Sequence, residues 1–282
     1  SAGDAGAGAA GGAPAPLAPL GPGAAAAGMA KGSPTPGAAR RTAAKKTVRA
    51  RPAAKSRGVV AGSAEASPPA PWFGTYTGTN NPEYQRYMRE EWGWEKRGDV
   101  PLFEKLCLEG QQAGLSWATV LAKRQAYRKA FHGFNIGKCA AMTSVGVQRI
   151  MADARRGPGG PEAVILHRGK LLSIVNNAKC VLELRKRPYV DPATNVAHKT
   201  LDGLLWSFVG GKPVLNRWPS AKAMPTTTPT AEAMSKVLKK LGFSFVGPTI
   251  CYSLMQSCGL VVDHPEGTPE HRAAAARLRR RR

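Results

Sequence analysis

One expected helix constrains the fold of this chain more than any other feature, because its apolar side carries a carboxylate. At helical spacing Leu102, Leu106 and Glu109 fall at positions i, i+4 and i+7 and share one side. The charged residues Glu104 and Lys105 are predicted to lie on the opposite side. A carboxylate buried near a helix C-terminus is unfavourable unless a partner compensates for it. This pattern indicates a functional position.

A second interpretation places Glu109 in solvent. The helix can fray at Gly110, since glycine is a poor helix former, and the last turn would then open toward water. The spacing alone favours neither interpretation.

The first 70 residues of this 282-residue chain differ in composition from the rest. They are almost entirely Ala, Gly, Pro, Ser, Thr, Lys and Arg, with too little bulky apolar surface to offset the entropy of ordering. We expect residues 1–70 to form a disordered basic tail or targeting segment and residues 71–270 to form one domain. Residues 271–282, which end in an arginine run, are expected to form a second disordered basic tail.

A formal net charge of +23 makes a polyanion, and nucleic acid in particular, the natural partner. A solvated tail would explain the basic ends but not a basic folded region. An acid-poor leader suits an organelle and clustered basic residues suit nuclear import, so both compartments are left open. No apolar run approaches the length of a membrane span, so we expect a soluble protein.

The five cysteines are scattered singly through apolar helical patterns. An odd, dispersed set argues against a disulfide framework and for a reducing compartment, and it lacks the clustering of an iron–sulfur site. Core packing is the expected role of each.

A helical hairpin is predicted near the end of the domain. A first helix carries its apolar residues at i, i+3, i+4 and i+7 and ends before Gly242, and a second opens at Gly247 and Pro248. Exposed amides at such a helix start can hold a DNA phosphate without reading sequence. Packed helix pairs also end in glycine, but the lysines of the first helix favour DNA contact.

Several sequence blocks, in order, resemble the 3-methyladenine DNA glycosylase I family of alkylation-repair enzymes. The resemblance covers roughly residues 72–268, and its blocks are residues 84–87, 91–93, 109–121, 127–131, 167–170, 205–209 and 242–252. It implies an all-α fold of the helix-hairpin-helix glycosylase type. It also implies a monofunctional enzyme, expected to be a monomer, that excises 3-methyladenine from alkylated double-stranded DNA and leaves an abasic site. The alternative is a relative of the same fold that is inactive or has altered base specificity.

The resemblance also suggests site residues. Glu109 is the catalytic candidate, as an acceptor for the adenine amino group, and the base-binding candidates are Tyr87, Trp117, Tyr84 and Trp92. Candidate DNA contacts are Gly114, Leu115, Arg168, Lys170, Gly242, Gly247 and Thr249. For Arg168 and Lys170 a solvated helix face is an equally good interpretation.

The family carries a structural zinc ion held by two cysteines and two histidines. Here His264 matches one ligand position, but Met88 and Thr268 occupy two others, and no cysteine precedes Cys107. Because methionine and threonine do not replace imidazole and thiolate on zinc, we expect the metal site to be lost and no cofactor to be needed. Asp263, after the hairpin, is a candidate for activating water or for ordering the chain.

Overall fold

The structure, a computed structural model, describes residues 81–280. Its first half contains α2 (Pro82–Glu90), α3 (Asp99–Gln112), α4 (Trp117–Ala122), α5 (Arg124–Ala130), α6 (Ile136–Ala141) and α7 (Ser144–Arg156). Its second half contains α8 (Arg168–Lys186), α9 (Leu201–Ser207), α10 (Pro229–Lys240), α11 (Pro248–Ser257) and α12 (Pro269–Arg279). Short 3-10 turns lie at His132–Phe134, Gly160–Glu162 and Ala221–Ala223. The all-α prediction is confirmed, while the tail predicted for residues 1–70 lies outside the described residues.

Two minimal strand ladders accompany the helices. Strands β1 (Tyr189–Val190) and β2 (Ala197–His198) are antiparallel, and β3 (Val214–Leu215) and β4 (Val261–Val262) are parallel. Among the described residues, no helix is both long and apolar enough to cross a membrane.

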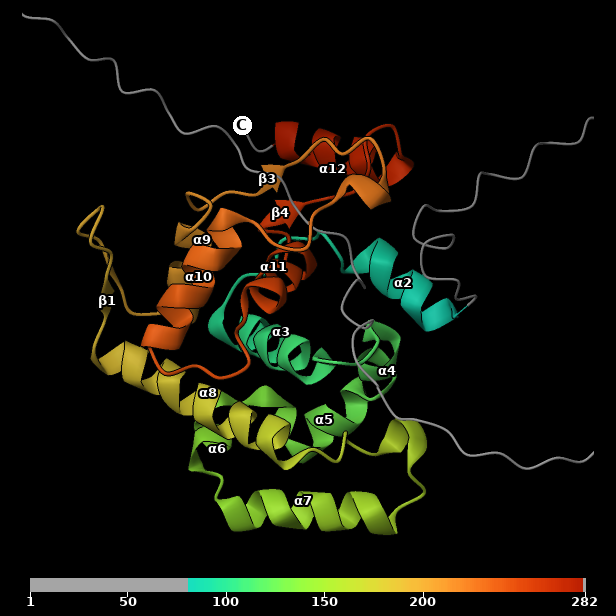
Figure 1. Ribbon diagram of the computed structural model, residues 1–282, viewed down its shortest axis with the longest axis vertical. Coiled ribbons are helices and arrows are strands. Elements are labelled where there is room, and N and C mark those ends of the chain that lie inside the picture. The colour runs from blue at the N-terminus through green and yellow to red at the C-terminus, as the bar shows by residue number, and fades with distance from the viewer. Residues whose placement is uncertain (1–80, 281–282) are drawn as a thin grey trace, which may run out of the picture. The chain divides into compact units, whose positions relative to one another are not determined.

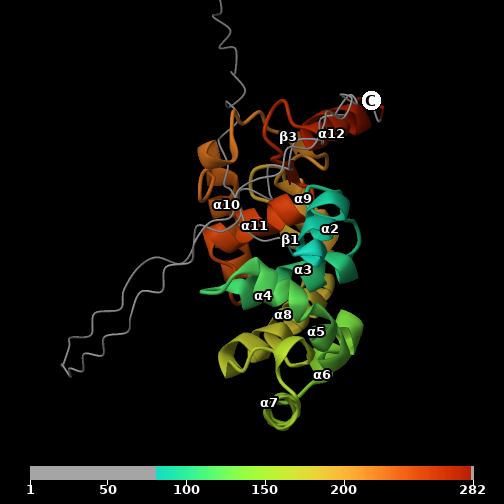
Figure 2. The same ribbon diagram turned by 90° about the vertical axis from the view of Figure 1, so that its right-hand side faces the viewer.

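Helix α3 runs through the centre of this helical assembly (Figures 1 and 2). Helices α12 and α7 lie at opposite ends of the assembly. It packs against α4, α8, α9 and α11. Every residue of α3 from Leu102 to Gln111 is buried, so this stretch of the helix has no solvent side. Any charged side chain on it must therefore find a partner inside the protein.

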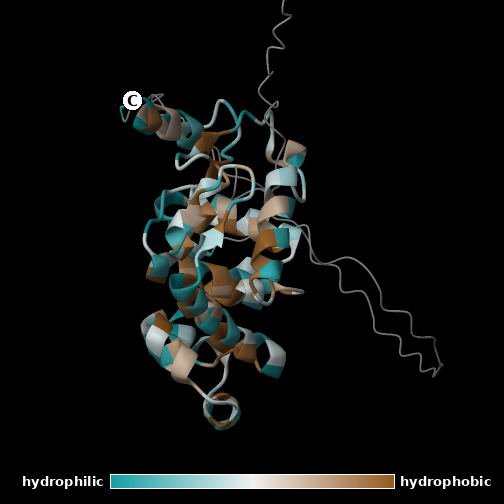
Figure 3. Ribbon diagram, turned by 90° about the vertical axis from the view of Figure 1, so that its left-hand side faces the viewer, coloured by the Kyte–Doolittle hydropathy of each residue, from teal (hydrophilic) through white to brown (hydrophobic). Residues whose placement is uncertain are grey.

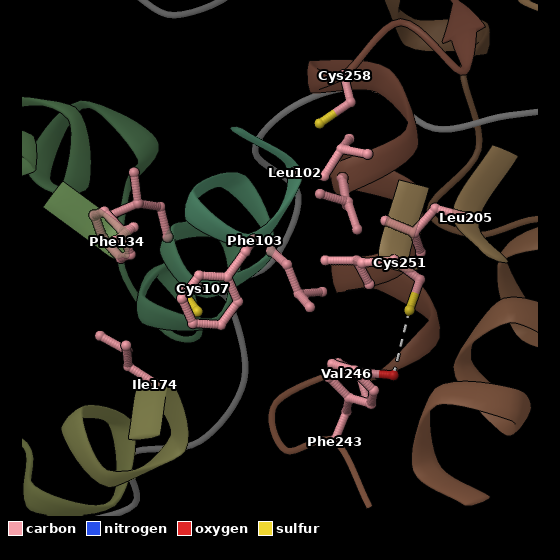
Figure 4. Packing of buried hydrophobic residues seen from close by; sticks show 14 of the residues in the cluster. Leu102, Phe103, Cys107, Phe134, Ile174, Leu205, Phe243, Val246, Cys251 and Cys258 are labelled. Atoms are coloured by element: carbon pink, nitrogen blue, oxygen red, sulfur yellow. Dashed lines mark hydrogen bonds between the residues drawn. The ribbon is translucent and has the colours of Figure 1, made fainter. Parts of the chain in front are cut away.

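The core around α3 is apolar and closely packed (Figure 4). Phe103 and Cys107 of α3 lie near Phe134 and Ile174, while Leu102 lies near Leu205. All five cysteines are free, and four of them are buried in this core, as predicted. Polar colours dominate the outward helix faces, whereas the apolar residues gather between the helices (Figure 3).

The predicted hairpin is present as α10, a short turn and α11. Gly242 follows α10 with φ of 86°, a left-handed conformation that glycine adopts without strain. The turn is tied to α8, because Asn177 accepts from Ser244 N (2.8 Å) and donates to Ser244 O (3.0 Å). It also meets α3, where a Cβ added to Gly110 would lie 3.1 Å from Phe245 Cβ. Hairpin and central helix thus share one packed interface.

The C-terminal tail was predicted incorrectly, because most of it is a docked helix. Thr268 caps α12 by accepting from His271 N (3.2 Å), and Pro269 occupies its first turn. His271 and Ala274 are buried, and the Arg277 guanidinium donates to Gly93 O (2.9 Å). Basic residues at a helix C-terminus are favoured by the helix dipole, which explains why an arginine-rich end is ordered here.

Candidate active site

A small pocket opens between α2, α3, α4 and α11. It is lined by Tyr84, Tyr87, Met88, Trp92, Glu109, Gln112, Trp117, Ser253, Gln256 and Ser257. The fold therefore brings together the five residues predicted for base binding and catalysis, from three separate helices and the turn after α2. The free volume is only ≈ 20 Å³, room for about one water molecule.

Glu109 is held inside this pocket. Helix α3 continues past Gly110 to Gln112, so the solvent interpretation of Glu109 is wrong, and only 3% of the residue is exposed. Phe245 packs over Gly110 and excludes water from this turn, which stabilises helix where glycine alone would weaken it.

Lys105 was predicted on the opposite side of α3, and this was wrong. Lys105 and Glu109 are four residues apart, which places them on the same helix face, and their Nζ and Oε1 atoms lie 3.3 Å apart. The Lys105 ammonium also donates to Tyr87 Oη (2.9 Å) and lies 4.0 Å from the centre of the Trp117 ring. Burial lowers the pKa of Lys105, an effect that the Glu109 carboxylate opposes.

The aromatic side chains form the pocket walls. The rings of Tyr87 and Trp117 are 5.3 Å apart and tilted by 43°, and Tyr84 packs edge-on against Tyr87. Burial raises the pKa of Tyr87 well above its usual value, so its hydroxyl stays neutral. The buried indole Nε1 of Trp117 has no hydrogen-bond acceptor among the described residues. An unused buried donor in a binding pocket is well placed for a ligand.

Asp263 lies behind the pocket and is fully buried. Its carboxylate accepts hydrogen bonds from Tyr252 Oη, Asn216 Nδ2 (2.7 Å), Trp218 Nε1 (3.1 Å) and Gln256 Nε2 (2.9 Å). Burial raises its pKa to about 6, and these donors oppose the shift. Four donors occupy its oxygens, so the geometry favours ordering of the chain over activation of water.

The residues at the family's zinc positions do not fit a metal site. Met88 is fully buried in the core, and the Thr268 hydroxyl caps α12. His264 packs against the edge of Trp92, and burial together with nearby Arg277 lowers its pKa to about 3. The described residues contain no group of three potential ligands, and a guanidinium beside His264 would repel a metal cation. Arg277 instead ties α12 to Gly93 and stacks 4.1 Å from the Trp94 ring centre.

All the predicted DNA contacts except Lys170 reach solvent, and three of them lie on the hairpin. Gly114, Leu115, Arg168, Gly242 and Thr249 are exposed, and Gly247 is half-buried. The turn carrying Gly114 and the start of α8 are joined through the side chain of Lys170, which donates to Ala113 O (2.6 Å) and Gln111 O (2.8 Å). Lys170 is buried, so the prediction that it contacts phosphate is wrong and its role is structural.

A larger cavity of ≈ 410 Å³ lies on the other side of Tyr87, and most of its charged groups are already paired with one another. Arg124 donates to Glu91 (2.8 Å) and to Glu104 (2.6 Å), and Arg128 also binds Glu104 (2.9 Å). These ion pairs join α2, α3 and α5. We assign this cavity a structural role.

Comparisons with known proteins agree with this geometry. Residues 77–271 match the family model described as methyladenine glycosylase. DNA-3-methyladenine glycosylase 1 of Escherichia coli is 44% identical over 191 residues, which are 67% of this chain and 91% of that protein. The Haemophilus influenzae DNA-3-methyladenine glycosylase is 42% identical over 199 residues, covering 71% and 95% of the two chains. The Staphylococcus aureus 3-methyladenine DNA glycosylase I structure aligns with a TM-score of 0.60 at 35% identity, covering 69% and 94%.

Proposed function

The chain belongs to the methyladenine glycosylase family, and we propose that its pocket excises 3-methyladenine from alkylated DNA by hydrolysis of the N-glycosidic bond. The observation that carries this function is the buried Glu109 carboxylate in a pocket that Tyr87 and Trp117 also line, at the end of a helix that packs on the hairpin. In an inactive DNA-binding relative this carboxylate would serve only as the ion-pair partner of Lys105, so release of 3-methyladenine distinguishes the two possibilities.

The chemistry follows from the pocket. A base inside a duplex is out of reach, so the nucleotide must be drawn out of the stack and bound by ring contacts and edge hydrogen bonds. Trp117 and Tyr87 supply ring faces, Glu109 accepts from the exocyclic amino group, and Trp117 Nε1 supplies a donor. The methylated base carries positive charge while attached to the sugar and leaves readily. The remaining demand is to stabilise an oxocarbenium-like sugar while water attacks.

The exposed residues beside the pocket suit duplex DNA. The amides at the start of α11 have no side-chain cap and can hold a phosphate. Lys236, Lys239 and Lys240 are exposed on α10 and add favourable charge. Leu115, an exposed apolar residue on the turn after α3, can enter the space that an extruded base leaves. One chain contains all these parts, so we propose that it works as a monomer.

The direct experiment is incubation of the purified chain with methylated duplex DNA, followed by chromatography of the released bases. We expect free 3-methyladenine and an uncut strand that carries abasic sites. Strand cleavage without added alkali, or the absence of any released purine, would contradict the proposal.

We propose that the fold needs no zinc. Elemental analysis should find no stoichiometric metal, and chelators should leave the thermal midpoint unchanged. Arg277→Ala should lower the midpoint by several degrees, because Gly93 O loses a charged donor and Trp94 loses a stacking cation. Arg279→Ala, at an exposed position of the same helix, is the matched control. One tightly held zinc ion per chain would contradict the proposal that the fold needs no metal.

The basic N-terminal segment should strengthen binding to any DNA. Residues 1–70 lie outside the described residues but carry nine Lys and Arg against two acids. Each phosphate that they neutralise releases counterions, so deleting them should flatten the dependence of log K on log salt. Titration of an undamaged duplex at several salt concentrations measures this slope. Equal slopes for the full and shortened chains would show that the segment makes no DNA contact.

A further inference from the structure

An internal cation already occupies the contacts that a charged base would use. The Lys105 ammonium pairs with Glu109 (3.3 Å), donates to Tyr87 Oη (2.9 Å) and lies 4.0 Å from the Trp117 ring centre. Its side chain is 1% exposed, so no solvent screens these interactions. Carboxylate, hydroxyl and π face are the groups that would select a positive base.

This cation changes the charge balance of the pocket. Without Lys105, the Glu109 carboxylate would leave a net negative site, because the Tyr87 hydroxyl is neutral. With Lys105 protonated, the pair is neutral, and a cationic base would meet a like charge at close range in a poorly screened site. The Glu109 side chain then gives little preference for positive over neutral bases.

The pair also presents a donor beside an acceptor. A neutral purine that places an acceptor next to a donor along one edge is complementary to it, as hypoxanthine is with O6 and N1–H. Lys105 would donate to the oxygen and Glu109 would accept from the ring N–H. Any base must part the rings of Tyr87 and Trp117, because the free volume is ≈ 20 Å³. The small free volume therefore opposes the binding of cationic and neutral bases alike. The charge of the pocket decides which of the two binds more tightly.

We propose that Lys105 is a specificity-determining residue, which by pairing with Glu109 removes the selection for a cationic base and admits neutral purines that offer an acceptor beside a donor. This inference rests on the proposed glycosylase function. It predicts that the unaltered chain releases hypoxanthine as well as 3-methyladenine.

The test compares single-turnover release of 3-methyladenine from methylated duplex with release of hypoxanthine from a duplex that carries one such base. Lys105→Met should raise the ratio of the two rates by about tenfold or more, because it restores an unneutralised Glu109. Lys105→Arg should keep the original ratio, since it keeps the cation. Lys123→Met is the matched control, because Lys123 donates to Ala163 O (2.8 Å) and Gly160 O outside the pocket.

Thermal midpoints establish that each variant is folded, and Lys105→Gln provides a second neutral variant if Lys105→Met does not fold. An unchanged ratio in a folded neutral variant overturns the role of Lys105 while the glycosylase function stands. Loss of 3-methyladenine release in the neutral variants, with rescue by Lys105→Arg, would also overturn it. If no form of the chain releases 3-methyladenine, the proposed function fails and this inference fails with it.

Discussion

Glu109→Gln should lower the rate of 3-methyladenine release by roughly a hundredfold or more. The change keeps the shape of the side chain but removes its charge and replaces one acceptor oxygen with a donor. Glu109 is 3% exposed, so water cannot substitute for the lost oxygen. Single-turnover release from methylated duplex measures the effect.

Two controls separate this loss from general damage. Affinity for undamaged duplex should barely change, because Glu109 is remote from solvent. Glu104→Gln alters the same helix at a carboxylate that faces Arg124 and Arg128 instead of the pocket. It should reduce thermal stability but lower release no further than the folded fraction requires. Near-normal release by a stably folded Glu109→Gln protein would remove Glu109 from the chemistry.

Asp263→Ala should cost about 3 kcal/mol or more of unfolding free energy, because several buried donors lose their acceptor together. Tyr252, Asn216, Trp218 and Gln256 all donate to this carboxylate. Urea titration of both proteins measures the difference. Glu266→Ala should change stability little, because Glu266 is exposed and its ion-pair partner within residues 81–280 is the exposed Arg217.

The same variant distinguishes the two roles considered for Asp263. Gln256 lines the base pocket, so a modest loss of activity should accompany the loss of stability. If Asp263→Ala were fully stable yet inactive, Asp263 would be part of the chemistry and not of the chain's support.

Local patterns in the sequence predicted α3, the hairpin and its glycines, because each rests on spacing and caps within a few residues. The burial of Lys105 was missed because charged residues were assigned to a solvent side of the helix. The middle of α3 is enclosed by other helices on every side and has no such side. The four-residue spacing from Glu109 was the available signal.

Two errors near charged residues share a cause. Lys170 and the end of the chain were treated as exposed because they are basic, yet Lys170 binds backbone carbonyls and Arg277 binds Gly93 O. Cations also satisfy buried carbonyl groups, and composition does not distinguish that use from phosphate binding. The Thr268-Pro269 start of α12 was the overlooked sign of a helix.

The bonds between the hairpin turn and its two supporting helices bear on how damage is found. Asn176 and Asn177 of α8 hold the turn, and Gly110 of α3 packs beneath it. The hairpin, which we propose to contact the strand, is thus joined directly to the helix that carries Glu109. If the hairpin holds the strand as proposed, the duplex supplies the bending and unstacking, so a nucleotide that stacks weakly is drawn out first. Mechanical weakness of the damaged DNA then contributes to its recognition before any atom of the base is read.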